Sequence, residues 1–158
     1  MNTSNETIVV IGVGRIGLPF ALVLADHNFN VIGVDMDPQK IATIQQKKLP
    51  FMEEGADELL QKHYGVNFSV IHESFISAII HDTNYIVITL GTPLNDTYGP
   101  DLTQIDNLFK KIIPLLNKDQ TIILRSTLSP GTTELIARRL NEKGLIVGED
   151  IYLAYCPE

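Results

Sequence analysis

The sequence predicts an α/β fold: a doubly wound, mostly parallel six-stranded sheet with helices on both faces. Two features of the 158-residue chain predict it. Six short runs of apolar, largely β-branched residues alternate with longer segments of helical period, which favours parallel strands joined by right-handed crossovers. The runs are also almost continuously apolar, which suits a sheet covered on both faces. Together these features indicate one α/β domain.

The strands and the first helix follow directly from this pattern. After the first strand, Ile16, Phe20 and Leu24 recur at i, i+4 and i+8, the spacing of an apolar helix face that packs on a sheet. The region 47–65 is less regular and is expected to contain only a short helix around 57–62. The strands are expected at residues 8–11, 31–34, 68–71, 85–90, 121–124 and 151–155.

Two later helices carry recognisable end signals. Thr103 and Asp106 have the spacing of a capping box, which places a helix start at Thr103. Ser129 and Pro130 are typical of an N-cap and a first helical residue. Gly144 is a typical stop for the helix that follows them.

Composition and charge exclude several classes of protein. The formal net charge is −7 and no block of Lys and Arg is present, so nucleic acid is not an expected partner. Cys156 is the only cysteine, which rules out an intrachain disulfide and favours a cytoplasmic location. Residues 1–6 are polar and expected to form a flexible tail, and the apolar run after them is too short for a membrane span. The four histidines lack the spacing of a metal site, so no metal is predicted.

A glycine-rich turn, GVGRIG, joins the first strand to the first helix. In a Rossmann-type dinucleotide site, Gly12 permits the tight turn, Gly14 lets the backbone approach a pyrophosphate, and Gly17 allows close packing of helix on strand. The N-terminus of the helix supplies free N–H groups and partial positive charge for the anion. The alternative explanation is that the glycines only form a tight crossover.

An acidic residue follows this turn at the distance expected for a dinucleotide site. The second strand ends in Asp35, 23 positions after the first glycine, where a carboxylate accepts hydrogen bonds from the adenosine ribose. Asp35 and Asp37 would repel the 2′-phosphate of NADP, and only Lys40 is nearby as a counter-charge, so NAD is the expected cofactor. Arg15 and Ile16 of the turn are also expected to line the cofactor, although an Arg15 that faces water fits the sequence equally well.

Polar residues follow three other strands at the same edge of the predicted sheet. Ligands of doubly wound sheets bind beyond the carboxyl ends of the strands. Hydroxyls there can line a cofactor, and a carboxylate can act on substrate or water. Thr-Pro and Ser-Pro are also common turn formers, so simple turn chemistry is the alternative. The segments are 89–93, 125–127 and 156–158, which contain Thr92, Pro93, Ser126, Thr127 and Glu158.

The order and spacing of these motifs resemble the N-terminal domain of the UDP-glucose/GDP-mannose dehydrogenase family over almost the whole chain. The resemblance includes the glycine turn up to Pro19, the acidic strand end at Asp35 and the basic Lys40. The end of the chain is more similar to the UDP-N-acetylmannosamine dehydrogenase branch than to the UDP-glucose branch. Further matching segments are Leu49-Pro50-Phe51 with Glu53, Gly91-Thr92-Pro93, Asp101-Leu102, Ser126-Thr127, Pro130-Gly131-Thr132 and Pro157-Glu158.

The resemblance implies an NAD-dependent enzyme that oxidises the C6 hydroxyl of a UDP-sugar to a carboxylate with two NAD. The implied route passes through an aldehyde and a thioester on a cysteine, and the implied substrates are UDP-N-acetylmannosamine, UDP-N-acetylglucosamine or UDP-glucose. By position, Thr92, Pro93 and Ser126 contact the dinucleotide. Thr127 lies at the cofactor and places the hydrolytic water, and Glu158 assists hydrolysis. The implied setting is polysaccharide biosynthesis, and the full-length enzyme is expected to be a homodimer or larger.

The chain also departs from this family. Residues 1–158 correspond to the NAD-binding domain alone, without the central and C-terminal substrate domains, so the fragment is expected to be inactive. The family's nucleophilic cysteine lies in those later domains, and Cys156 matches a different motif. Glu54 and Ala56 replace the usual Pro and Leu, and Arg125 stands where a lysine is frequent. Two other functions are open: a non-catalytic nucleotide-sensing module, or another NAD-dependent dehydrogenase such as a 3-hydroxyacid type.

Overall fold

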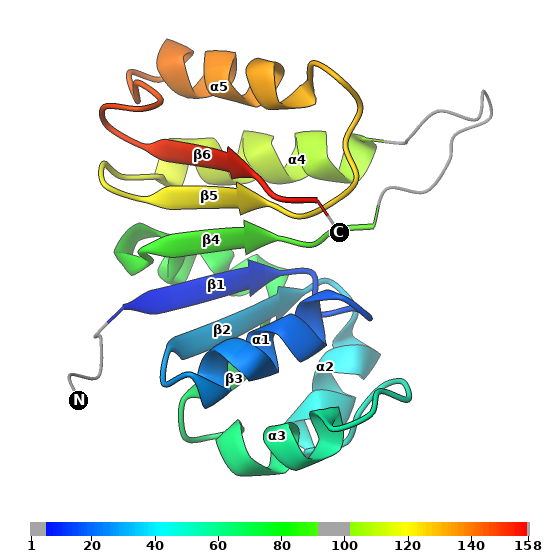
Figure 1. Ribbon diagram of the computed structural model, residues 1–158. Helices are drawn as coiled ribbons and strands as arrows, with labels where there is room; N and C mark the ends of the chain where they lie inside the picture. Colours follow the sequence, from blue (N-terminus) through cyan, green and yellow to red (C-terminus); the bar gives the residue numbers. More distant parts are fainter. Residues whose placement is uncertain (1–5, 92–101, 158) are drawn as a thin grey trace.

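Six parallel strands form a single sheet in the order β3-β2-β1-β4-β5-β6 (Figure 1). The computed structural model describes residues 6–91 and 102–157. Every pairing is parallel, so the predicted doubly wound sheet is confirmed without an antiparallel exception. The strands are β1 Thr7–Ile11, β2 Asn30–Asp35, β3 Phe68–His72, β4 Tyr85–Ile88, β5 Thr121–Leu124 and β6 Tyr152–Tyr155.

The chain winds outward from β1 in both directions. β1 pairs with β2 on one side and with β4 on the other, in the registers Ile11↔Val34 and Ile11↔Ile88. The connections that leave β1 and β4 therefore diverge at the carboxyl edge of the sheet, on the right in Figure 1. A switch point of this kind opens a crevice in which doubly wound proteins bind their ligands.

Helices cover both faces of the sheet, as predicted. Their buried residues fall into two separate clusters, one with α1–α3 and the other with α4, α5 and the short 3-10 helices. α1 to α3 lie in front of the sheet in Figure 1, mostly over its β1–β3 half. The helices are α1 Gly17–Asp26, α2 Pro38–Gln45, α3 Ala56–His63, α4 Thr103–Ile112 and α5 Thr132–Glu142, with 3-10 helices η1 Glu73–Ala78, η2 Ile80–Asp82 and η3 Ile113–Leu115.

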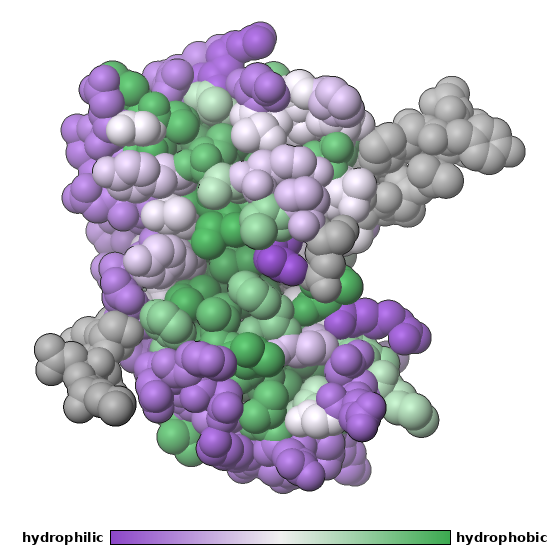
Figure 2. Space-filling model, in the orientation of Figure 1, coloured by the Kyte–Doolittle hydropathy of each residue, from purple (hydrophilic) through white to green (hydrophobic). Residues whose placement is uncertain are grey.

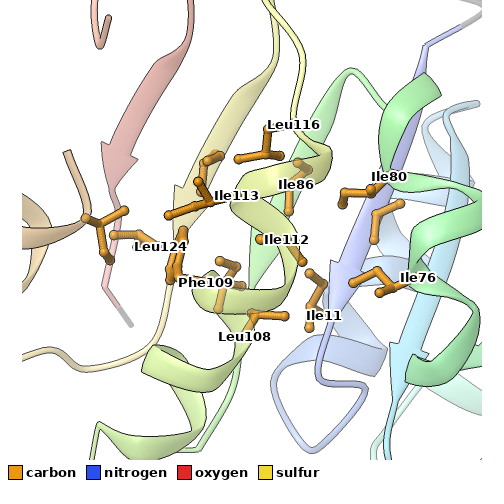
Figure 3. Packing of buried hydrophobic residues seen from close by; sticks show 14 of the residues in the cluster. Ile11, Ile76, Ile80, Ile86, Leu108, Phe109, Ile112, Ile113, Leu116 and Leu124 are labelled. Atoms are coloured by element: carbon orange, nitrogen blue, oxygen red, sulfur yellow. The ribbon is translucent and has the colours of Figure 1, made fainter. Parts of the chain in front are cut away.

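The larger core lies behind the sheet. Phe109 and Ile112 of α4 are fully buried there, in one cluster with Ile11, Ile80 and Ile86 (Figure 3). Each such side chain contributes about 1.5–3 kcal/mol of hydrophobic stabilisation. On the front, apolar residues gather in a band between α1 and the upper strands (Figure 2). The two clusters thus fix the sheet from both sides and hold its carboxyl edge in place.

The N-terminal ends of three helices add to or correct the sequence expectations. α2 was not predicted, yet Asp37 caps it by accepting hydrogen bonds from the N–H groups of Gln39 and Lys40, at 2.9 and 3.2 Å. α4 does begin at Thr103, as predicted, but Leu102 rather than Thr103 is its N-cap. α5 begins after Gly131, which adopts the left-handed conformation with φ 86°. The N–H of Thr132 donates to the carbonyl of Ser129 at 3.1 Å, so residues 129–132 form a separate turn and the helix begins later than the predicted start at Ser129 and Pro130.

Gly144 does end α5, as predicted. It has φ 80° and follows the C-cap residue Lys143. Its N–H donates to the carbonyl of Asn141, and the N–H of Leu145 donates to the carbonyl of Leu140. These bonds satisfy carbonyls that the helix end would otherwise leave free.

Acid is expected to destabilise the domain through Asp106. Its hydrogen bonds to Lys110 and then Arg139 lower the pKa of this carboxyl below its usual value of 3.8, and they join α4 to α5. A carboxyl whose pKa is depressed by folding contributes stability above its unfolded-state pKa and loses it as the pH falls through the folded-state value. Urea unfolding followed by circular dichroism should therefore show a lower midpoint at about pH 3 than at about pH 6. The decrease in the urea midpoint between about pH 6 and about pH 3 should be smaller in Asp106→Asn than in the wild type. Equal decreases in the two proteins would contradict a contribution of Asp106 to acid unfolding.

Candidate functional site

A cleft of about 420 Å³ opens at the carboxyl ends of β1, β2 and β4, at the switch point of the sheet. Residues from both halves of the fold line it, so its shape depends on how the glycine turn and α4 face one another. The lining residues are Ile11, Gly12, Gly14, Val34, Asp35, Met36, Asp37, Lys40, Glu73, Thr89, Leu90, Gly91, Gln104, Asn107, Leu108 and Lys111.

The glycine turn is packed tightly against the ends of β2 and β4. Gly12 has φ 97°, and its N–H donates to the carbonyl of Val34 at 2.7 Å. The hydroxyl of Thr89 donates to the carbonyl of Gly12 at 2.6 Å, which ties the turn to β4. A Cβ at Gly17 would lie only 1.8 Å from that same carbonyl oxygen. The spacing of these two glycines is therefore required by the contact between the turn and the start of α1.

Gly14 differs from the other two glycines because it faces open space. A Cβ built on it meets no atom within 4 Å, and it lines the cleft. In residues 6–91 and 102–157, the backbone N–H groups of Gly14, Arg15 and Ile16 meet no hydrogen-bond acceptor. Free N–H groups at a helix N-terminus form a site for an anion. The turn thus offers donors beside a space that no side chain fills.

Asp35 lies next to the turn with its carboxylate fixed by three donors. It is only 8% exposed. Its Oδ2 accepts from the N–H of Val13 at 3.0 Å and from the Nζ of Lys40 at 2.7 Å, and its Oδ1 accepts from the N–H of Asp37 at 3.0 Å. An ionised carboxylate oxygen can accept more than one hydrogen bond, so Oδ1 retains capacity for a ligand hydroxyl. The charge of Lys40 is already balanced by this carboxylate.

The opposite wall of the cleft comes from α4, and sequence reasoning missed it. Gln104, Asn107, Leu108 and Lys111 follow one another at i, i+3, i+4 and i+7, the spacing of one helix face. That spacing is readable in the sequence, but none of the predicted site residues lies on this helix. The Nζ of Lys111 donates to the carbonyl oxygen of Glu73 at 3.0 Å and lies 3.6 Å from its carboxylate Oε1. The wall therefore combines amide groups with a balanced ion pair.

The structure places the predicted site residues in two groups. Gly12, Gly14, Asp35 and Lys40 meet in the cleft, whereas five others are absent from its described lining. Three of the five belong to the glycine turn: the guanidinium of Arg15 lies over Phe51, Ile16 is the exposed N-cap of α1, and Gly17 is buried at the start of α1. The other two follow β5. Ser126 is buried and its hydroxyl donates to the carbonyl of Leu90 at 2.7 Å, whereas Thr127 is exposed.

Several expectations fall outside the described residues. Thr92, Pro93 and Glu158 are among them, as is the N-terminal tail apart from Glu6. Within residues 6–91 and 102–157, no group of three His, Cys, Asp or Glu side chains is arranged to hold a metal ion. None of the helices in that part of the chain combines the length and apolar character needed to cross a membrane.

Comparisons with known proteins agree on one family. The model of the "UDP-glucose/GDP-mannose dehydrogenase family, NAD binding domain" matches residues 6–158. A UDP-N-acetyl-D-mannosamine dehydrogenase of Campylobacter jejuni is 33% identical over 100% of this chain and 40% of its own length. The chain therefore spans less than half of that relative.

Two solved structures have the same fold over nearly the whole chain. The UDP-D-ManNAc dehydrogenase of Pyrococcus horikoshii superposes with a TM-score of 0.88 at 30% identity, over 97% of this chain and 36% of its own. A ternary complex of GDP-mannose dehydrogenase from Pseudomonas aeruginosa has a TM-score of 0.84 at 27% identity, over 96% of this chain and 36% of its own. In both, the matched region is about a third of a longer chain.

Proposed function

Because the chain belongs to the UDP-glucose/GDP-mannose dehydrogenase family as its NAD binding domain, we propose that it supplies the cofactor half of a nucleotide-sugar 6-dehydrogenase. The longer enzyme would oxidise the C6 hydroxyl of UDP-N-acetylmannosamine, UDP-N-acetylglucosamine or UDP-glucose to a carboxylate with two NAD. One observation carries the proposal: the free N–H groups at Gly14 and the carboxylate of Asp35 belong to the same cleft.

The residues of the cleft fit a dinucleotide. The N–H groups of Gly14, Arg15 and Ile16 would bind the pyrophosphate, and no side chain at Gly14 obstructs it. Oδ1 of Asp35 would accept from an adenosine ribose hydroxyl, with the carboxylate held in place by Val13 and Lys40. When bound, NAD supplies a hydride acceptor. The chain's own residues bind and orient it.

The remaining roles rest on position in the family pattern. In this proposal Thr92, Pro93 and Ser126 lie along the dinucleotide, Thr127 places the hydrolytic water, and Glu158 acts as the base on that water. The nucleophilic cysteine would come from a later part of the longer enzyme, which would bind the UDP-sugar. We extend the proposal to a cytoplasmic homodimer or larger homo-oligomer that makes sugar acids for polysaccharide biosynthesis. For the 3-hydroxyacid alternative, a 3-hydroxyisobutyrate dehydrogenase of Salmonella typhimurium shares the fold with a TM-score of 0.60, but its 15% identity supports no common function.

The isolated chain is expected to produce no NADH from NAD and any of the three UDP-sugars, because the proposal places the nucleophilic cysteine and the sugar site in a later part of the longer enzyme. The longer protein that contains it should produce two NADH per UDP-sugar consumed. Both are measured by the absorbance of NADH, with sugar consumption followed by chromatography. NADH formation by the isolated chain, or failure of the longer protein with all three sugars, would refute the proposal.

A further inference from the structure

Arg15 lies in the middle of the glycine turn, and an aromatic ring holds its guanidinium. Its Cζ atom is 5.8 Å from the centroid of the Phe51 ring, within the range of a cation–π interaction. Arg15 is exposed, whereas Phe51 is half-buried and packs against the core under α1. Phe51 belongs to the segment between α2 and α3, so this segment reaches back to the turn.

Arg15 differs from the cations that line the cleft. Lys40 is 2.7 Å from the carboxylate of Asp35, and Lys111 is 3.6 Å from that of Glu73, so both ammonium charges are balanced. Among the described residues, no carboxylate lies within ion-pair distance of Arg15. An aromatic face fixes a guanidinium without neutralising it and leaves the N–H groups at its edge able to donate. The guanidinium of Arg15 therefore lies beside the free N–H groups of the turn without a carboxylate partner among the described residues.

We propose that Phe51 is a positioning residue that holds Arg15 ready for the pyrophosphate of the dinucleotide. The inference rests on the proposed function, because it places that anion at the N–H groups of Gly14 and Ile16. The pyrophosphate is negative and the chain has a net charge of −7, so an unbalanced cation beside the turn offsets the repulsion between them. Without the ring, the Arg15 side chain would sample more rotamers in the free protein. Fixing it in one rotamer on binding would then cost entropy and weaken the affinity for NAD.

A double-mutant cycle on NAD affinity tests this role. Calorimetric titration with NAD is carried out on the wild type, Phe51→Leu, Arg15→Gln and the double variant. Leucine keeps the apolar volume and removes the ring face, whereas Phe51→Tyr keeps the ring and is the matched control. Adenosine, which has no pyrophosphate, is titrated by NMR chemical shifts as the second ligand. Circular dichroism checks the fold of each variant.

Phe51→Leu should raise the Kd for NAD by about two- to fivefold, the range of an exposed cation–π interaction, and leave the Kd for adenosine unchanged. Arg15→Gln should raise the Kd for NAD by about tenfold to a hundredfold. The double variant should match Arg15→Gln alone, and Phe51→Tyr should match the wild type.

Two other results would overturn the inference while leaving NAD binding intact. One is that Phe51→Leu raises the Kd for NAD and the Kd for adenosine equally. The other is that Phe51→Leu still raises the Kd for NAD about two- to fivefold when it is added to Arg15→Gln. Absence of NAD binding by the wild type would instead overturn the proposed function, and this inference with it.

Discussion

Gly17→Ala is expected to destabilise the domain by about 3 kcal/mol or more, the upper range for a forced overpacking. The added Cβ would lie 1.8 Å from the carbonyl oxygen of Gly12 and 2.5 Å from the hydroxyl oxygen of Thr89. The first contact is with backbone, which cannot rotate away as a side chain can. Relief requires α1 to move off the glycine turn, and the buried Leu18 and Ala21 would move with it. Urea unfolding followed by circular dichroism measures the loss.

Gly14→Ala is the matched control for that experiment. The same methyl group at Gly14 meets no atom within 4 Å, and Gly14 does not need a positive φ. The free energy of unfolding should therefore stay close to that of the wild type. Equal destabilisation by the two alanines would show that the close contact at Gly17 does not control stability.

Gly14→Val is expected to weaken NAD binding by about a hundredfold while the domain stays folded. Gly14 lines the cleft and is where the backbone would come nearest to the pyrophosphate. A branched side chain there would keep the phosphates away from the free N–H groups of the turn. Losing charge-assisted hydrogen bonds costs about 1.5–3 kcal/mol each, which corresponds to roughly tenfold to a hundredfold in affinity. Calorimetry measures the change, and a native circular dichroism spectrum confirms that the fold persists.

The sheet could be predicted because its inner strands β1, β2 and β4 are mostly buried and therefore read as apolar runs, whereas the edge strand β6 is largely exposed and is recognisable by its β-branched and aromatic residues. The glycine turn and Asp35 could be predicted because their constraints are local. Gly17 must be small wherever α1 starts against Gly12, and Asp35 ends the strand that neighbours β1. Such requirements depend on a few neighbouring residues and leave a fixed spacing in the sequence.

The wall formed by α4 could not be predicted in the same way. Gln104 and Asn107 are ordinary polar residues on an amphipathic helix, and only the packing of α4 on the sheet turns them toward the cleft. The opposite holds for Ser126, which was predicted to contact the cofactor. Its hydroxyl donates a hydrogen bond to the carbonyl of Leu90 and so joins two strand ends. Which polar groups face a cleft depends on tertiary packing, which spacing along the chain does not record.

Titration of the purified chain with NAD in a calorimeter tests the central claim most directly. The account predicts saturable heat at one site per chain with the wild type. Gly14→Val, whose fold is checked by circular dichroism, should bind NAD about a hundredfold more weakly and therefore give little heat. Absence of NAD-dependent heat with the folded wild type, or equal affinity in the two proteins, would contradict the assignment of this cleft as the NAD site.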